Sequence, residues 1–412
     1  MNRSSSKHGK SVNLSPERLD LLTKLLVEDA KEIIANGVNG WLKEQQELLA
    51  RLLINREVRG LVGDRNEHNS DRDFIRWGSQ EGSVLLSEQR VPIKKQRVRT
   101  KDRKCEVPLD TYAALNTKEF LNTQAAAKLL SGLSSRRFEK TLEKHLRGHG
   151  IGRQTISERG IAEMTKQLEE FQTRSLASLN IIAVFMDGIH LGDDVYIAAV
   201  GIDSTGKRHV LGFESGSTEY SGVCRALLSR LIDRGVLDES GGILFIVDGG
   251  KGLRKAIRDV FGKRAHVQRC IIHKRRNVEE KLPQKLVSEF RHKFNAAYAK
   301  ESHKDSERAF VELRDWLVRN RRPAAAASLL EGQQEMLTLH KLGISGVLRR
   351  SLCTTNCIES LFSAARYYMR NVKRWRGEEH MNRWIASGLL EAEKNLRKIP
   401  GYSQLLKLKQ AL

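Results

Sequence analysis

The sequence of 412 residues lacks any apolar run long enough to cross a membrane. Its first segment, "MNRSSSKHGKSVNLSPERL", is basic and polar, without the apolar stretch and small-residue cleavage site of a secretory leader. Binding to a membrane surface would need an amphipathic basic helix with aromatic anchors, or a spanning run. These absences predict an intracellular, cytoplasmic protein with no membrane partner.

Cysteine is also scarce, and none of the five cysteines forms a CxxC pair. This pattern disfavours both a disulfide framework and a four-cysteine zinc site, so we expect reduced thiols. We find no tandem repeat of 20 to 50 residues, which disfavours repeat architectures. The cysteines are Cys105, Cys224, Cys270, Cys353 and Cys357.

Acidic residues are too few to balance the basic ones. The 50 Asp and Glu residues face 72 Lys and Arg residues, which leaves a formal charge of +22. Such an excess favours a polyanionic partner, and nucleic acid is the leading candidate. The length predicts two or more domains, and the 40% apolar share is enough for a sizeable core.

The first 104 residues read as a helical region followed by a linker and a basic arm. Apolar residues recur at helical spacing over 14–54, whereas 55–90 has little periodicity and suits a loop or linker. The segment "VPIKKQRVRTKDRK", residues 91–104, holds seven Lys or Arg residues. It suits a solvated linker or an arm that neutralises phosphates. We therefore expect residues 1–90 to be a helical N-terminal region with a linker.

Residues 117–172 contain three amphipathic helix candidates in close succession. Ser134 suits the N-cap of the second candidate, and the glycine-rich "GHGIG" permits a turn before the third. Such a unit resembles a helix-turn-helix, although many three-helix clusters bind no DNA. With the basic arm, residues 91–175 form our expected DNA-binding domain.

From about 180 the pattern changes to strands, in the order βββαβαβ over 176–281. This order is how a ribonuclease-H-like fold begins, and in that fold the first and fourth strands are neighbours. We expect each of these strands to end on an acid, Asp187 and Asp248. Helical patterns then dominate: an insertion over 282–350, a helix that returns to the core within 351–395, and a tail over 396–412.

Carboxylates that converge from separate elements suit divalent cations in phosphodiester chemistry. Glu359, in the predicted helix "TTNCIESLFSAARYYMR", is the natural third acid. Each acid also has an ordinary interpretation. Asp187 could be a turn residue before a glycine, Asp248 could cap the helix that begins at 251, and Glu359 could be a surface acid. His190 and Glu219 are weaker candidates and stay outside the set.

Five spaced motifs resemble the Mutator-type transposases of bacterial insertion sequences. They are "FMDGIHLG", "GFESGSTEYSGVCRALLSRLIDRG", "IVDGGKGLRKAI", "VQRCIIHKRRNV" and "TTNCIESLFS", within about residues 120–385. The resemblance implies an α/β fold with a ribonuclease-H-like mixed sheet, an all-helical insertion and helical DNA-binding N-terminal domains. The chain departs from the family at Tyr220, where tryptophan is usual, and at Gly250, where alanine is common.

The same resemblance implies an active site. Asp187, Asp248 and Glu359 would bind Mg²⁺, with Mn²⁺ able to substitute, and His273 would be a further catalytic residue in a Cys-x-x-His element with Cys270. Half of a zinc site is the competing interpretation of that element. The expected DNA-binding residues are Arg269, Cys270, Arg275, Arg276, Asn277, Arg366, Arg370, Lys373 and Arg374. Trp375 could stack on a base, but core packing is the commoner fate of tryptophan.

These observations predict a DNA transposase that binds terminal inverted repeats and target DNA as a homodimer or higher oligomer, near the bacterial nucleoid. It would cleave DNA strands and transfer them with the help of metal ions. Two alternatives remain: a ribonuclease-H-like nuclease without strand transfer, and a non-catalytic DNA-binding regulator derived from a transposase. Loss of an acid would mark the regulator, and all three acids are present.

Overall fold

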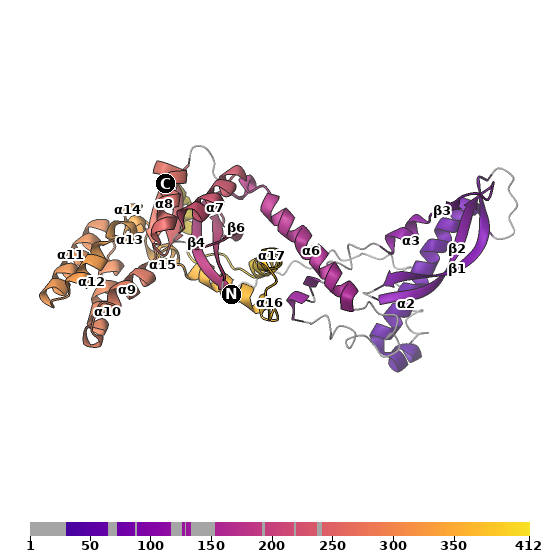
Figure 1. Cartoon of the computed structure of the whole chain (residues 1–412), viewed down its shortest axis with the longest axis horizontal. Coiled ribbons are helices and arrows are strands. Elements are labelled where there is room, and N and C mark those ends of the chain that lie inside the picture. The colour runs from indigo at the N-terminus through magenta and orange to yellow at the C-terminus, as the bar shows by residue number, and fades with distance from the viewer. Residues whose placement is uncertain are drawn as a thin grey trace. The chain divides into compact units, whose positions relative to one another are not determined.

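The computed structural model describes residues 30–64, 72–86, 89–116, 126–127, 129–132, 153–191, 194–217, 220–236 and 241–412. The chain divides into two compact units, Met1–Ala125 with Ser135–Arg159, and Ala126–Ser134 with Gly160–Leu412. Figure 1 labels the elements of both. Among the described helices, none is both long enough and apolar enough to cross a bilayer.

In the first unit a long helix packs on a small antiparallel sheet of order β1-β2-β3. Its buried residues recur at four-residue spacing, Ala50, Ile54, Val58 and Val62, so they form one stripe along the helix. That stripe meets valines and an isoleucine of the sheet in a single core. The elements are α2 (Ala30–Val62), β1 (Phe74–Leu86), β2 (Gln89–Thr100), β3 (Glu106–Val107) and α3 (Asp110–Ala114).

This sheet corrects two expectations from the sequence. Residues 55–90 are not a loop, because α2 continues to Val62 and β1 follows it. Residues 91–104 are not a basic arm, because β2 pairs with β1 along almost its whole length. Val91 and Ile93 are buried at every second position while Pro92 and Lys94 are exposed, which is strand periodicity hidden by the charge. The N-terminal region is therefore helix and sheet, not helix alone.

The expected trihelical unit lies largely outside the described residues. Most of its first helix, its second helix and Ser134 fall there, as do residues 1–29; residues 126–127 and 129–130 of the first helix are described and helical. Its third helix is present as α6 (Arg153–Thr173).

The second unit contains a five-stranded mixed sheet of order β6-β5-β4-β7-β8. The pairs β4–β5 and β5–β6 are antiparallel, and β4–β7 and β7–β8 are parallel. The predicted βββαβαβ order is confirmed, as is the pairing of its first and fourth strands. The elements are β4 (Ile181–Leu191), β5 (Asp194–Asp203), β6 (Arg208–Ser215), α7 (Ser221–Asp233), β7 (Ile243–Val247), α8 (Lys251–Phe261) and β8 (Ala265–Arg269).

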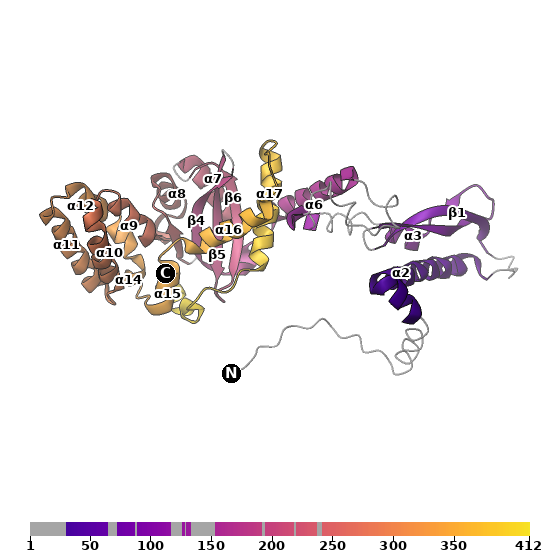
Figure 2. The ribbon, with the colours of Figure 1, turned by 90° about the horizontal axis from the view of Figure 1, so that it is seen from below.

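Apolar cores cover both faces of this sheet. On one face, α7 and α8 pack against residues such as Met186 and Val247. On the other, α16 (Asn356–Met369) and α17 (Glu378–Lys394) pack against residues such as Phe185 and Ile246 (Figure 2). Burial on both faces explains why β7 reads as an unbroken apolar run, Ile243–Val247.

Between β8 and α16 the chain is helical, as predicted for the insertion. Its longer helices enclose a core around Phe290, Phe294 and Phe310, and Ser302 caps α11 by accepting from the backbone N–H of Asp305. The helices are α9 (Ile271–Glu279), α10 (Gln284–Ala299), α11 (His303–Arg319), α12 (Pro323–Leu330), α13 (Gln333–Met336), α14 (Thr338–Lys341) and α15 (Gly346–Leu352); α18 (Leu405–Ala411) follows α17.

One arginine ties the end of α6 to the sheet. The guanidinium of Arg234 donates to the carbonyl oxygens of Phe171 and Arg174, at 2.8 and 3.0 Å, and to that of Leu211 on β6, at 2.8 Å. It therefore satisfies carbonyls that the end of α6 leaves without helical partners.

We expect Arg234→Met to lower the free energy of unfolding by about 2 kcal/mol, because it removes three charge-assisted hydrogen bonds from a half-buried position. Urea denaturation followed by circular dichroism measures the change. Arg225→Met, at an exposed position of α7, is the control and should stay within about 0.5 kcal/mol of the parent. Equal stability of the two variants would refute the role of Arg234.

Candidate active site

Strand pairing brings the two aspartates together. In the parallel pair of β4 and β7, Met186 is the partner of Val247, and this is the last paired position. The next residues along the chain are Asp187, still in β4, and Asp248, just after β7. One expectation needs correction: Asp187 does not end its strand, because β4 continues to Leu191 against β5. Asp187 is instead the first residue of β4 beyond the part that pairs with β7.

Asp248 is held by the turn that follows β7. Its Oδ1 accepts from the backbone N–H of Gly250 at 3.0 Å. The cap residue of α8 is Gly250 itself, without a side-chain cap, so Asp248 is not the helix cap that the sequence allowed. Gly249 has a φ of +105°, and a Cβ at that position would collide with the guanidinium of Arg269. The glycine pair therefore serves both the turn and this contact.

Glu359 lies in the first turn of α16, four residues after the N-cap residue Thr355. The buried Thr355 hydroxyl lies 2.7 Å from Oε1 of Glu359 and donates to it. The Glu359 side chain keeps 46% of its surface exposed. Glu359 is thus an accessible carboxylate whose direction is set by a buried hydroxyl.

His273, on the first turn of α9, lies next to these acids. Its Nε2 is 4.0 Å from Oε1 of Glu359, and its Nδ1 is 3.4 Å from the Thr355 hydroxyl. A hydrogen bond with Cys270 is the main reason that the pKa of His273 rises to about 9; burial opposes the rise, and the charges of Cys270, Asp187 and Glu359 add to it. The imidazole therefore carries a proton at neutral pH.

The acids themselves repel one another. Burial is the main cause that raises the pKa of Asp187 to about 6, and the charge of Asp248 is the next. The Gly188 N–H and His273 lower it, and Glu359 raises it slightly. The charges of Asp248, Glu359 and His273 therefore all act on the pKa of Asp187.

Two of the expected DNA-binding residues have little surface. Cys270 is completely buried, and burial raises the pKa of its thiol, but hydrogen bonds with His273 and Thr355 outweigh burial and lower it. Arg269 is 5% exposed and donates to the carboxylate of Glu331 at 2.7 Å. These contacts point to supporting roles, not to the DNA contacts expected from the sequence.

Glu331, just after α12, forms ion pairs with basic side chains from three elements of the core. Its Oε2 also accepts from the buried Lys274 at 2.6 Å, and its Oε1 from Arg254 at 3.2 Å. Burial would raise the pKa of Glu331, but the hydrogen bonds from Arg269 and Lys274 hold it at about 2. This cluster joins the helical insertion to β8, α9 and α8.

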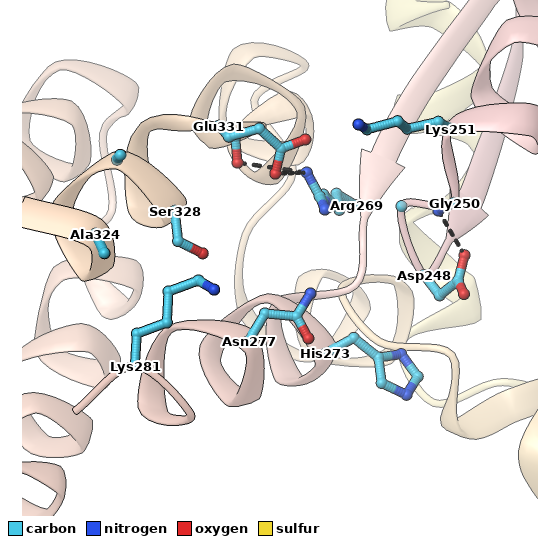
Figure 3. Close-up of a pocket in the computed structure, with 12 residues that line it drawn as sticks. Asp248, Gly250, Lys251, Arg269, His273, Asn277, Lys281, Ala324, Ser328 and Glu331 are labelled. Atoms are coloured by element: carbon cyan, nitrogen blue, oxygen red, sulfur yellow. Dashed lines mark hydrogen bonds and ion pairs between the residues drawn. The ribbon is translucent and has the colours of Figure 1, made fainter. Parts of the chain in front are cut away.

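A pocket of about 840 Å³ opens between α8, α9 and α12 (Figure 3). Asp248 and His273 lie on one side of it, and Lys281 and Ser328 on the other. The small side chains Ala324 and Ala327 leave room along α12. Asp248 thus borders an open space that is large enough for part of a polymer, whereas Asp187 and Glu359 are not among its lining residues.

The other expected DNA-binding residues lie on the surface, with one exception. Arg275 is partly buried beside Glu279, at 3.4 Å, and Asn295, at 3.0 Å. Asn277 lines the pocket of about 840 Å³. The exposed ones are Arg276, Asn277, Arg366, Arg370, Lys373 and Arg374.

Comparison with known proteins decides the family. A family model described as "Transposase, Mutator family" matches residues 18–398. The chain belongs to the Mutator transposase family.

Transposases of insertion sequences are among the relatives of this Mutator-family chain. That of IS905 from Lactococcus lactis is 26% identical over 266 residues, which cover 62% of this chain and 65% of that protein. That of IS6120 from Mycolicibacterium smegmatis is 28% identical, over 58% of this chain and 73% of that protein. That of IS256 in Tn4001 from Staphylococcus aureus is 26% identical, over 64% and 67%. The match with the Lactococcus protein thus spans less than two thirds of its length.

Two residues of this Mutator-family site escaped the sequence analysis. Thr355 is four residues before Glu359, a spacing that puts both on one side of a helix, and this spacing could have signalled it. Glu331 had no such signal, because its partners Arg269 and Lys274 are about 60 residues away along the chain. Among the weaker candidates, His190 is exposed on β4, and Glu219 lies outside the described residues.

Without divalent cations, the contribution of Asp187 to the stability of this transposase-family chain should fall as pH rises from about 4 to about 6. The difference between the parent and Asp187→Asn isolates this contribution, because the lowered pKa of His340 acts in the opposite direction over the same window. The raised pKa of Asp187 means that the folded chain keeps a proton that the unfolded chain releases near pH 4, so the folded state binds more protons in this window. Asp187→Asn should be up to about 3 kcal/mol more stable than the parent at pH 7.5. Both effects are measured by urea denaturation in EDTA.

The matched control is Asp259→Asn, at an exposed position of α8, which should follow the pH profile of the parent. If Asp187→Asn is no more stable than the parent at pH 7.5, the carboxylates do not repel one another as described.

Thr355→Val should destabilise the fold by about 1 to 2 kcal/mol, because it removes a buried hydroxyl that contacts both Glu359 and His273. Thr355→Ser should recover most of the loss. Ser363→Ala removes an exposed hydroxyl that bonds only the backbone oxygen of Glu359, and it should have little effect. Thermal unfolding of the four proteins tests this; a stable Thr355→Val variant would contradict it.

Proposed function

We propose that this chain is a DNA transposase that binds the terminal inverted repeats of an insertion sequence and catalyses metal-dependent strand cleavage and strand transfer. The proposal includes a ribonuclease-H-like core for the five-stranded sheet. The observation that supports it is the position of Asp187 and Asp248 just after the last paired residues of β4 and β7, with Glu359 close enough for its charge to act on Asp187. The family membership supports the reaction class.

The donor set suits Mg²⁺, with Mn²⁺ as a substitute. Carboxylate oxygens are the ligands that Mg²⁺ prefers, and it keeps several waters, so one or two carboxylates per ion suffice. Among the described residues, no group of three or more His, Cys, Asp or Glu side chains is arranged to hold a metal ion, so the proposal requires these acids to draw closer around the cation. Burial is the main cause of the raised pKa of Asp187, and the charges of Asp248 and Glu359 add to it, so a bound cation would favour the ionised carboxylate.

Asp187, Asp248 and Glu359 would hold the metal ions. When bound, such ions activate the attacking oxygen and stabilise the departing one in phosphodiester chemistry. The same carboxylates would serve cleavage by water and joining by a freed 3′ hydroxyl.

The chain's own residues would position the DNA. The protonated His273 can donate to a phosphate oxygen next to Glu359, and Thr355 keeps Glu359 aimed at the same place. Asn277, Lys281 and Lys251 line the adjoining pocket and can hold the backbone further along the strand.

Exposed basic residues extend this surface for DNA. Arg276, Arg366 and Arg370 present free surface suited to phosphates. We also propose assembly on DNA as a dimer or higher oligomer, because two element ends must be brought together for transposition. A nuclease without strand transfer would need the same acids, so joining of a 3′ end separates the two proposals.

Asp187→Asn, Asp248→Asn and Glu359→Gln should each lower cleavage and joining of the element's ends by at least about 1000-fold, because each removes a cation ligand. The measurement uses the purified full chain, Mg²⁺ or Mn²⁺, and DNA that carries the flanks of its own gene. Binding of the same DNA in EDTA should stay within about threefold of the parent.

Glu391→Gln on α17 is the control, because Glu391 pairs only with the nearby Lys394 among the interactions described; it should cut like the parent. A triad variant that still cuts removes that acid from the proposed site. Cleavage without joining would favour the nuclease, and binding without cleavage by the parent would favour the regulator.

A further inference from the structure

A second pocket, of about 580 Å³, lies in the same unit and shares no residue with the first. It lies between the sheet and the turn that joins α16 to α17. Its lining combines an aromatic ring, Trp375, with two basic residues, Lys373 and Arg374, and two acids, Asp194 and Glu378.

This pocket lies on the same sheet face as the acid cluster. Asp187 is the cross-strand partner of Ala198, and Tyr196, which lines the pocket, is two residues further along β5. Residues two apart on a strand point to the same face, about 7 Å apart. Helix α16 carries Glu359 in its first turn and ends at Met369, shortly before the turn with Trp375.

Packing against the core and against His380 holds Trp375 in place. Its ring is partly buried against the large core and lies 5.9 Å from the ring of His380. His380 in turn accepts from the indole N–H of Trp384 at 3.1 Å. A ring fixed in this way loses little conformational freedom when a ligand stacks on it.

The charges of the pocket select the class of ligand. A phosphate alone would be repelled by Asp194 and Glu378, and an apolar ligand would leave all four charges without partners. Both acids act on the buried Tyr196, because their charges help burial to raise the pKa of its phenol, so they lie near the inner wall. A nucleotide offers a flat ring, amino donors and a phosphate together.

We propose that this pocket binds one unpaired nucleobase of a DNA strand, stacked on Trp375. Its amino groups donate to Asp194 or Glu378, and Lys373 and Arg374 bind the adjoining phosphates. The inference rests on the proposed function only in taking DNA as the partner. It assigns a base-binding site outside the metal-binding acids.

The test measures binding of the full chain to single-stranded probes in EDTA, by fluorescence anisotropy. One probe is a fluorescein-labelled strand of ten deoxyadenylates, and the other has ten abasic units with the same phosphates. Trp375→Ala should weaken binding to the first probe about tenfold or more, and binding to the abasic probe by less than about twofold. Trp375→Phe should stay within about threefold of the parent on both.

Two controls separate the site from its surroundings. Tyr220→Ala removes an aromatic ring just before α7 that is 70% exposed and lies outside the pocket, and it should leave both affinities unchanged. Arg374→Ala should weaken both probes to a similar extent, because it removes a phosphate contact.

A measurement on the unmodified chain tests the proposal without depending on whether the variants fold. A single 2-aminopurine among thymidines should lose fluorescence when the strand binds, because stacking quenches it. Unchanged 2-aminopurine fluorescence in the bound strand would overturn the proposal. The proposal would also be overturned if Trp375→Ala weakened binding to the adenylate probe and to the abasic probe equally. Because no cation is present and no cleavage is scored, failure of the metal-dependent chemistry leaves this test intact.

Discussion

The parallel pairing of β4 with β7 is the constraint on which the site depends. It puts Met186 beside Val247, and the next residues, Asp187 and Asp248, must then stand on neighbouring strands. A slip of one residue would turn one carboxylate to the opposite face. The register is held because both faces of these strands are buried, with every residue of β7 inside a core. Apolar packing on both sides thereby forces together two acids that repel each other.

A second constraint fixes the helical insertion on this sheet. Arg269, the last residue of β8, lies between two glycines, Gly249 and Gly332, at each of which a Cβ would collide with its guanidinium. Its charge and that of the buried Lys274 need a partner, because an unpaired buried cation is costly. Glu331 supplies it from the insertion. The segment that carries Cys270 and His273 begins at Arg269, so the same ion pairs anchor the imidazole near the acids.

Local patterns predicted the sheet well, and tertiary context explains the failures. The run before Asp248 is apolar at every position, which identified a buried strand, and the βββαβαβ order gave its neighbour. The strand within residues 91–104 was not predicted, because four basic residues of β2, Lys94, Lys95, Arg97 and Arg99, mask a two-residue alternation of apolar ones. The continuation of β4 beyond Asp187 depends on its pairing with β5, and no pattern near Asp187 reveals it. Glu331 was missed because its partners are distant in sequence.

Because of its hydrogen bond with Cys270, the imidazole of His273 depends less on the charges of the nearby acids for its raised pKa. If Asp187 and Glu359 were the main cause of the raised pKa of His273, a cation bound to them would remove that cause and favour loss of the proton. The hydrogen bond with Cys270, which is completely buried, is the larger cause. Neutralising the acids therefore removes only the smaller causes of the raised pKa of His273. A protonated imidazole beside the carboxylates is what the proposed contact with a phosphate needs.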